Sequence, residues 1–194
     1  MKDIHRRIMP LLSLALLFTT SAHAFEQAQQ DIRSHAVAVS GTVQVLFTPD
    51  DDAAGQIVQA IEQAQQQVLV QTFSFTSREI AQALISAKQR GVDVRVVTDA
   101  EQIRRMERSK VPTVAAGGVP VFVDNLHDSA HNKVMVIDAG SANPVVITGS
   151  FNFTHAAQFK NAENLLIFRG NRELTTAYLE NWRRHREHSQ PLVK

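Results

Sequence analysis

Hydrophobic residues along this chain follow two different spacings in turn. Short apolar runs bounded by turn residues predict β-strands at residues 43–47, 68–75, 92–98, 119–123, 133–138, 145–148 and 164–168. Apolar residues three and four positions apart predict helices between many of these strands. The clearest helix would start at Ser77 as its N-cap and stop at Gly91. Further helices are expected near 57–68 and 101–109, just before Gly117, and from Asn171 onward.

The alternation of strands and helices predicts an α/β fold. We expect a mixed, largely parallel sheet with helices on both faces. Residues 68–75 are mostly apolar, as in a strand that is buried on both sides. Tyr178 and Trp182 lie along one side of the last predicted helix, and their spacing favours a place in the core over a platform for stacking bases.

The N-terminal segment is typical of a secretory signal peptide. Lys2, Arg6 and Arg7 precede an apolar run at 8–18, and Ala22-His23-Ala24 provides small residues for cleavage before Phe25. The alternative is a membrane anchor, but the run is shorter than the roughly 20 residues that a bilayer requires. We therefore predict a signal peptide at 1–24, an arm or linker at 25–41, one folded domain at 42–194, and a periplasmic or secreted protein.

Charge and cysteine content restrict the possible partners and sites. The chain has 20 basic and 19 acidic residues, and without residues 1–24 the counts fall to 17 and 18. A nucleic-acid-binding surface would therefore depend on local clusters. Two clusters are present, and both could equally be solvated helix faces: Arg104, Arg105, Arg108 and Lys110, and Arg183, Arg184 and Arg186. The absence of cysteine excludes disulfides and thiolate metal sites.

Several acidic residues and histidines could suggest a metal site. Asp50, Asp51 and Asp52 precede a predicted helix, where carboxylates complement the helix dipole, so we favour capping over metal binding. His127 lies four residues before His131, but in a loop this spacing has no helical meaning, so a metal pair is not favoured. We expect His155 to be a surface or capping residue. His185 and His188 are expected to be solvated.

The most informative chemical feature is a histidine and a lysine at the start of one strand. If residues 133–138 form a strand, its two-residue repeat places His131 and Lys133 on the same face. The turn at 139–144 would return the chain through 145–148 and bring Ser150 and Asn152 beside them. A nucleophile, a cation and two neutral hydrogen-bonding groups are the set that displacement at phosphorus requires.

This joined pattern resembles the signature of the phospholipase D superfamily, whose members cleave phosphodiesters through a phosphohistidine. The pattern is His131-x-Lys133-x4-Asp138 followed by Gly149-Ser150-x-Asn152. The ten residues between Asp138 and Gly149 exceed the usual spacing, which we interpret as a longer hairpin loop. Segments 71–76, 88–94, 149–154 and 161–164 are similar to the small bacterial Nuc-type endonucleases, which carry one motif per chain and pair two chains.

The resemblance implies a role for each matching residue. His131 would be the nucleophile, and Lys133, Ser150 and Asn152 would bind the phosphate. Glu163 matches the acidic residue that accepts a hydrogen bond from the catalytic imidazole in those nucleases. His131 of the partner subunit would protonate the leaving group in a homodimer. Asp138 belongs to the motif but has the opposite strand parity to Lys133, so we expect a supporting structural role.

Three functions are compatible with the sequence. The first is a metal-independent, nonspecific endonuclease that cleaves DNA, with RNA as a further substrate, and that needs no cofactor. The second is a phospholipase D-type lipid phosphodiesterase or phosphatidyl transferase, which is less favoured because no amphipathic segment suited to a membrane follows the signal peptide. The third is a non-catalytic nucleic-acid binding module, against which the intact set of site residues argues.

Overall fold

A mixed sheet of eight strands forms the centre of the computed structural model, which describes residues 36–38 and 40–193. The predicted signal peptide and most of the predicted arm lie outside these residues. The strands are β1 (Thr42–Thr48), β2 (Gln67–Thr72), β3 (Asp93–Asp99), β4 (Val121–Asp124), β5 (Lys133–Ile137), β6 (Val145–Gly149), β7 (Glu163–Arg169) and β8 (Gln190–Pro191). The helices are α2 (Ala53–Gln63), α3 (Arg78–Gln89), α4 (Ala100–Arg105), α5 (Val111–Ala116), α6 (His155–Phe159) and α7 (Arg172–His188).

The strand order is β1-β7-β6-β5-β2-β3-β4-β8. Only the β2-β3 and β3-β4 pairs are parallel, and the remaining neighbours are antiparallel. The predicted α/β class and mixed sheet are confirmed, but parallel pairing is confined to one part of the sheet. Parallel pairing is possible for β2, β3 and β4 because α3, and then α4 and α5, carry the chain back before the next strand starts, whereas β5 and β6 form an antiparallel hairpin with a short loop.

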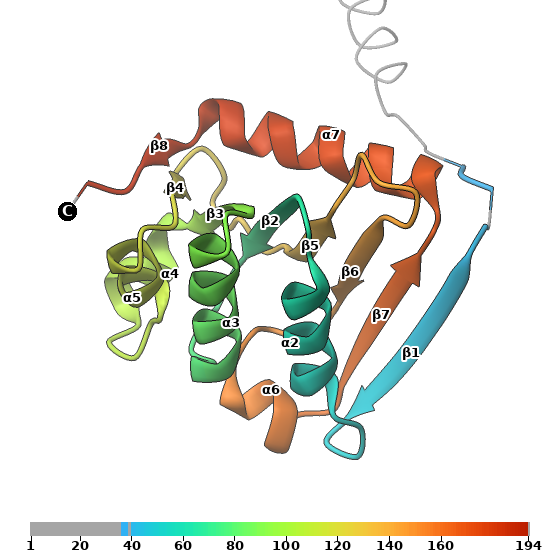
Figure 1. Cartoon of the computed structure of the whole chain (residues 1–194). Helices are drawn as coiled ribbons and strands as arrows, with labels where there is room; N and C mark the ends of the chain where they lie inside the picture. Colours follow the sequence, from blue (N-terminus) through green and yellow to red (C-terminus); the bar gives the residue numbers. More distant parts are fainter. Residues whose placement is uncertain (1–35, 39, 194) are drawn as a thin grey trace, which may run out of the picture. The chain divides into compact units, whose positions relative to one another are not determined.

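Helices cover both faces of the sheet, as predicted (Figure 1). On one face, Ile57 of α2 and Ile80 of α3 belong to the same buried cluster as Val70 and Met135 of the sheet. On the other face, Trp182 of α7 is buried and its indole N–H donates to the carbonyl oxygen of Val70 at 3.0 Å. Tyr178 packs against the same cluster. These contacts confirm the core role predicted for both aromatic residues of α7.

Polar residues begin the long helices in the way that the sequence predicted. The Ser77 hydroxyl accepts a hydrogen bond from the backbone N–H of Ile80 at the start of α3. Asp52 accepts from the N–H of Gly55, which confirms the capping interpretation for this residue of the acidic run. Asn171 caps α7 through the N–H of Leu174. Each cap stabilises its helix by roughly 1 kcal/mol.

Two short elements were not predicted from the sequence. α6 has only five residues, too few for a helical repeat to be recognised, although Thr154 caps it through the N–H of Ala157. β8 has two residues and exists only through its pairing with β4. Across the part of the chain that the structure describes, no helix combines the length and the apolar character needed to cross a membrane.

Candidate active site

All the predicted site residues except Asp138 lie where four strands meet at one end of the sheet. β5 and β7 begin at this end, and β2 and β6 finish there, because β5 runs antiparallel to both β2 and β6. Lys133 is the first residue of β5, Glu163 is the first residue of β7, and Ser150 directly follows β6. The topology therefore collects residues that are up to 32 positions apart in the sequence.

His131 and Lys133 contact each other directly. The Lys133 ammonium (Nζ) lies 2.9 Å from Nδ1 and 3.2 Å from Nε2 of His131, and it donates to the carbonyl oxygen of His131 at 2.8 Å. His131 is exposed, whereas Lys133 is buried. The exposed member of the pair is therefore the imidazole, the group that would attack an electrophile.

Phe73, just beyond β2, holds this pair in place. Its ring centroid is 4.4 Å from that of His131, at a tilt of 53°. Lys133 Nζ lies 5.1 Å from the same ring centroid, within the range of a cation–π interaction. Phe73 lies in the segment 71–76 that the resemblance covered, but its contact with the imidazole has no signal in the sequence.

Glu163 acts on Lys133 through its charge. Burial lowers the pKa of the Lys133 ammonium below its ordinary value, and the negative charge of Glu163 acts in the opposite direction. Glu163 Oε1 accepts a hydrogen bond from Asn161 Nδ2 at 2.9 Å. Within residues 36–38 and 40–193, no hydrogen bond joins Glu163 to His131, so this chain on its own does not show the contact that the resemblance implied.

Asn164 orients the serine of the site. The backbone N–H of Asn164 donates to Ser150 Oγ at 3.0 Å, and its side-chain amide donates to the same oxygen at 3.3 Å. With both donors on its oxygen, the hydroxyl proton of Ser150 is free to point toward a ligand. Gly149 makes this approach possible, because a Cβ at its φ of 147° would overlap the carbonyl oxygen of Asn164. Asn164 was part of a quoted segment, but its role was not predicted.

Asn152 lies on the strand-like segment that follows β6. Its Oδ1 accepts the backbone N–H of Ser74 at 3.4 Å, which leaves the amide NH2 group as the donor available to a phosphate. The neighbouring residues Phe75 and Phe153 form an isolated parallel bridge. Asn152 is therefore attached to the segment that carries Phe73, although neither Ser150 nor Asn152 makes a hydrogen bond to His131 or Lys133 in the described chain.

Asp138 lies at the opposite end of β5 from His131. Its buried carboxylate accepts the backbone N–H groups of Gln65, Gln66 and Gln67 at 2.7–2.8 Å. These bonds attach the start of β2 to the end of β5. This is a structural role, as we expected for Asp138 because it lies on the opposite side of the strand from Lys133. The loop 138–144 is at this same distant end, so the long spacing between Asp138 and Gly149 lengthens a hairpin away from the site.

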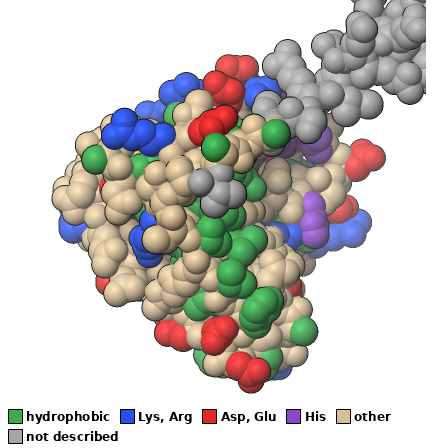
Figure 2. Space-filling view, turned by 90° about the vertical axis from the view of Figure 1, so that its right-hand side faces the viewer, with side chains coloured by type: hydrophobic (Ala, Val, Ile, Leu, Met, Phe, Trp, Pro, Cys, Tyr) green, Lys and Arg blue, Asp and Glu red, His purple; other side chains and the backbone are tan. Residues whose placement is uncertain are grey.

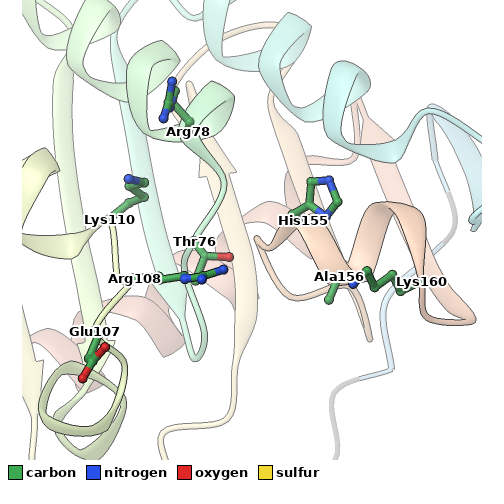
Figure 3. A pocket seen from close by; sticks show the side chains of 8 residues that line it. All are labelled: Thr76, Arg78, Glu107, Arg108, Lys110, His155, Ala156 and Lys160. Atoms are coloured by element: carbon green, nitrogen blue, oxygen red, sulfur yellow. The ribbon is translucent and has the colours of Figure 1, made fainter.

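A basic groove lies on segments that are adjacent in sequence to Phe73 and Asn152. It has a volume of about 630 Å³ and is lined by Arg78, Arg108, Lys110, Lys160, Glu107, Thr76, His155 and Ala156. Figure 3 shows Arg78, Arg108 and Lys110 on one side of it and His155 and Lys160 on the other. The backbone N–H groups of Thr76 and Ser77 donate to the carbonyl oxygen of Phe153, and that of Lys110 donates to Phe75. The groove is therefore built on the same segments as Asn152 and Phe73.

Comparison with known proteins identifies the family. Residues 57–186 match the family model described as "Cardiolipin synthase, PLD-like domain". The chain belongs to the phospholipase D superfamily. A protein named phospholipase D from Rickettsia prowazekii is 34% identical over 166 residues, which cover 86% of this chain and 78% of that protein. These findings confirm the predicted family, and they make the chain a phosphodiesterase of this superfamily.

Solved structures agree with the fold. The crystal structure of Nuc from Salmonella typhimurium, described as a phospholipase D family member, has a TM-score of 0.73 and 32% sequence identity. The likeness covers 80% of this chain and 100% of that one. NucT from Helicobacter pylori has a TM-score of 0.70 at 22% identity and covers 79% of this chain, which supports the fold alone.

Proposed function

We propose that this phosphodiesterase is a nonspecific endonuclease that cleaves DNA, with RNA as a further substrate, and that works as a homodimer. The single observation that carries the choice of substrate is the basic groove, which is built on the chain segments that directly follow Phe73 and Asn152. The expected location is the periplasm or the exterior of the cell, without stable membrane association.

His131 is the proposed nucleophile. A ring nitrogen of His131 attacks phosphorus, an N–P bond forms, and the P–O bond to the leaving strand breaks. The leaving oxygen takes a proton from His131 of the partner subunit. Water then attacks the phosphoramidate, the imidazole of the partner subunit takes the proton of that water, and His131 is released. Lys133, Ser150 and Asn152 stabilise the charge that develops on the non-bridging oxygens, and no divalent ion takes part.

The basic groove favours a polyanion as the substrate. Arg78, Arg108, Lys110 and Lys160 present four cations, against which Glu107 is the one acidic residue lining the groove. Cations along a groove bind successive backbone phosphates and carry no base information, so cleavage would have low sequence preference. Two residues of this groove, Arg108 and Lys110, belong to a cluster that the sequence suggested for nucleic-acid binding.

An exposed apolar strip favours a second copy of the chain as the partner. Val43, Val45 and Phe47 of β1 are 42%, 49% and 60% exposed. They pair with Phe168, Leu166 and Asn164 of β7, so side chains of both strands share this face. Figure 2 shows a band of hydrophobic side chains on the side where β1 lies. The strip reaches Asn164, and a partner on it would lie next to the site residues of β7.

The lipid phosphodiesterase is the second candidate, because the Rickettsia prowazekii relative is named phospholipase D. The two candidates share the chemical step and differ in what the surroundings of the site bind. A headgroup ester in a bilayer needs an apolar surface around the site, whereas a nucleic acid needs the cations of the groove.

Substrate assays with groove variants separate the two candidates. We expect the wild type to cleave plasmid DNA faster than phosphatidylcholine vesicles. Arg108→Ala/Lys110→Ala should weaken DNA binding and reduce the slope of log K against log[salt] by about 0.9 for each phosphate contact that is lost. Cleavage of bis(p-nitrophenyl) phosphate, which does not span the groove, should be unchanged. Arg183→Ala/Arg184→Ala removes two exposed cations of α7 and serves as the matched control.

Two outcomes of these assays would contradict the endonuclease proposal. Rapid hydrolysis of phosphatidylcholine with no nicking of plasmid DNA would favour the lipid phosphodiesterase. Binding of DNA without cleavage of any diester would favour the non-catalytic module.

The homodimeric site has its own test. His131→Ala should keep the fold and lose activity, because the nucleophile is removed. When this variant is mixed with wild type and subunits exchange, activity should fall as the square of the wild-type fraction. A linear fall would show that each subunit works alone.

A further inference from the structure

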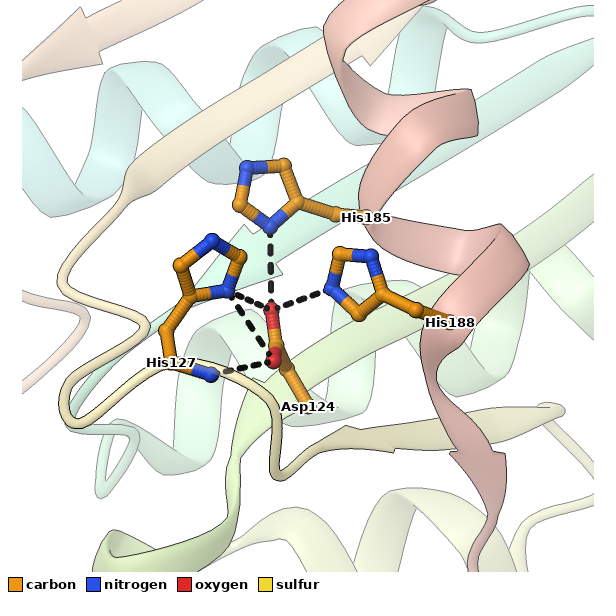
Figure 4. Close-up of side chains that lie close together, drawn as sticks. All are labelled: Asp124, His127, His185 and His188. Atoms are coloured by element: carbon orange, nitrogen blue, oxygen red, sulfur yellow. Dashed lines mark hydrogen bonds and ion pairs between the residues drawn. The ribbon is translucent and has the colours of Figure 1, made fainter. Parts of the chain in front are cut away.

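Three histidines surround one buried carboxylate, and none of these four residues belongs to the proposed active site. Asp124 is the last residue of β4 and is 0% exposed. His127 Nδ1, His185 Nδ1 and His188 Nε2 each lie 3.0 Å from Asp124 Oδ2. Figure 4 shows the three rings directed at this carboxylate, His127 from the loop after β4 and His185 and His188 from the end of α7.

The sequence did not predict this arrangement. We expected His185 and His188 to be solvated and considered His127 only together with His131. The two α7 histidines are three residues apart, so they share one side of the helix. Their partner on β4 is more than 60 positions away in the sequence, and only the packing of α7 on the sheet brings them together.

A single carboxylate oxygen cannot satisfy three imidazoles well. Oδ2 offers two lone pairs to three ring nitrogens, and each nitrogen would have to carry a proton to donate. Oδ1 also lies 3.2 Å from His127 Nδ1, but it already accepts the backbone N–H groups of Leu126 at 3.1 Å and of His127 at 3.4 Å, so the carboxylate has more donors around it than lone pairs. One metal dication in place of these protons would use the lone pairs of all three imidazoles and of the carboxylate.

The ligand types suit a tetrahedral zinc site, and the ligand atoms lie close together. One ligand atom from each of the four residues lies within 4.8 Å of all the others. Ligands of a tetrahedral Zn²⁺ with bonds of about 2.1 Å are about 3.4 Å apart, so the four ligand atoms would have to close in by up to about 1.4 Å. Imidazole ligands suit zinc, whereas magnesium and calcium prefer sets composed of oxygen.

We propose that Asp124, His127, His185 and His188 bind one Zn²⁺ ion per chain in a closed, structural site. The ion would join α7 to the loop 125–130, which leads directly into His131. The far end of this loop is held by Asp99, whose Oδ2 accepts the N–H of Ala130 at 2.9 Å. The zinc site would fix the near end, so that both ends of the segment before the nucleophile are anchored.

Metal content measured on the full chain, without a polyhistidine tag, tests the proposal. After dialysis against Zn²⁺ and then against buffer, mass spectrometry should find about one zinc per chain. His188→Ala and His127→Ala should each lose it, and both side chains are partly exposed, so the fold should tolerate the change. His155→Ala and His131→Ala remove histidines outside the cluster and should keep the full zinc content. Co²⁺ in place of zinc should give the visible absorption of a tetrahedral site.

Two results would overturn the zinc site. The first is a wild type that retains no zinc under these conditions, and the second is a zinc content that falls with His131→Ala but not with His188→Ala. Zinc should also slow cleavage of the wild type by chymotrypsin at Leu126, which is 67% exposed in the loop, and should leave the rate for His188→Ala unchanged. These readouts do not require activity, so a failure of the endonuclease proposal would leave them intact.

Discussion

Lys133 carries its charge in a buried position, and one nearby carboxylate helps to maintain it. Burial lowers the pKa of the ammonium, and Glu163 raises it. Glu163→Gln removes this opposing charge, so the pKa of Lys133 should fall further. The ammonium that holds the phosphate would then be lost at a lower pH. We expect the alkaline limb of the kcat/KM profile on a small diester to move to lower pH.

Glu180→Gln is the control for this prediction, because Glu180 is an exposed carboxylate on α7. It should leave the alkaline limb where it is in the wild type. An unshifted limb in Glu163→Gln would show that Lys133 does not set it.

Ser150 has its oxygen occupied by Asn164 and its proton free, so its proposed role is to donate to the phosphate. Ser150→Ala should lower kcat on the order of 10²-fold, the usual cost of one lost donor to a developing oxyanion. Ser141→Ala is the matched control, because its hydroxyl accepts from Asn143 in the loop at the far end of β5. Equal kcat values for Ser150→Ala and wild type would remove Ser150 from the phosphate site.

Among the elements, strands and long helices could be predicted because their own residues determine them. Apolar runs located seven of the eight strands, and Ser77 and Asn171 marked the first turns of α3 and α7. α6 and β8 are too short to have a pattern of their own. The sheet was expected to be more parallel than it is, since apolar content does not distinguish a buried antiparallel strand from a parallel one.

In the candidate site, too, local contacts could be predicted from the sequence and contacts between elements could not. His131 lies two residues before Lys133, the first residue of β5, so their mutual contact could be predicted from the two-residue repeat of an extended chain. Contacts that depend on how strands pair could not be predicted from the sequence. For this reason the roles of Phe73 and Asn164 were missed. The histidine cluster depends on the packing of α7 against β4, and the spacing of His185 and His188 on the helix does not by itself reveal their partner Asp124.

Asp138 connects two elements, and its effect should be on stability. Its carboxylate accepts three backbone N–H groups at the start of β2, and an amide in its place has only one acceptor oxygen. Asp138→Asn should lower the free energy of unfolding by about 1–3 kcal/mol, measured by urea denaturation. kcat should stay close to wild type at temperatures where the variant is folded.

Asp93→Asn breaks a partly exposed ion pair with Arg95 and should change the free energy of unfolding by less than about 1 kcal/mol. A loss of kcat in fully folded Asp138→Asn would instead mean that this carboxylate acts on the site from a distance.

At the scale of the whole molecule, the apolar strip of β1 and β7 links assembly to catalysis. If two copies meet there, Val45→Lys places a charge in the middle of the interface, where its desolvation cost is not compensated. Sedimentation should then show a monomer, and diester cleavage should fall with it because the leaving group loses its proton donor. Val193→Lys, at a residue that is 88% exposed near the C-terminal end, is the matched control and should remain a dimer. A monomeric Val45→Lys variant with full activity would separate the site from dimerisation, and a dimeric variant would place the interface on another face.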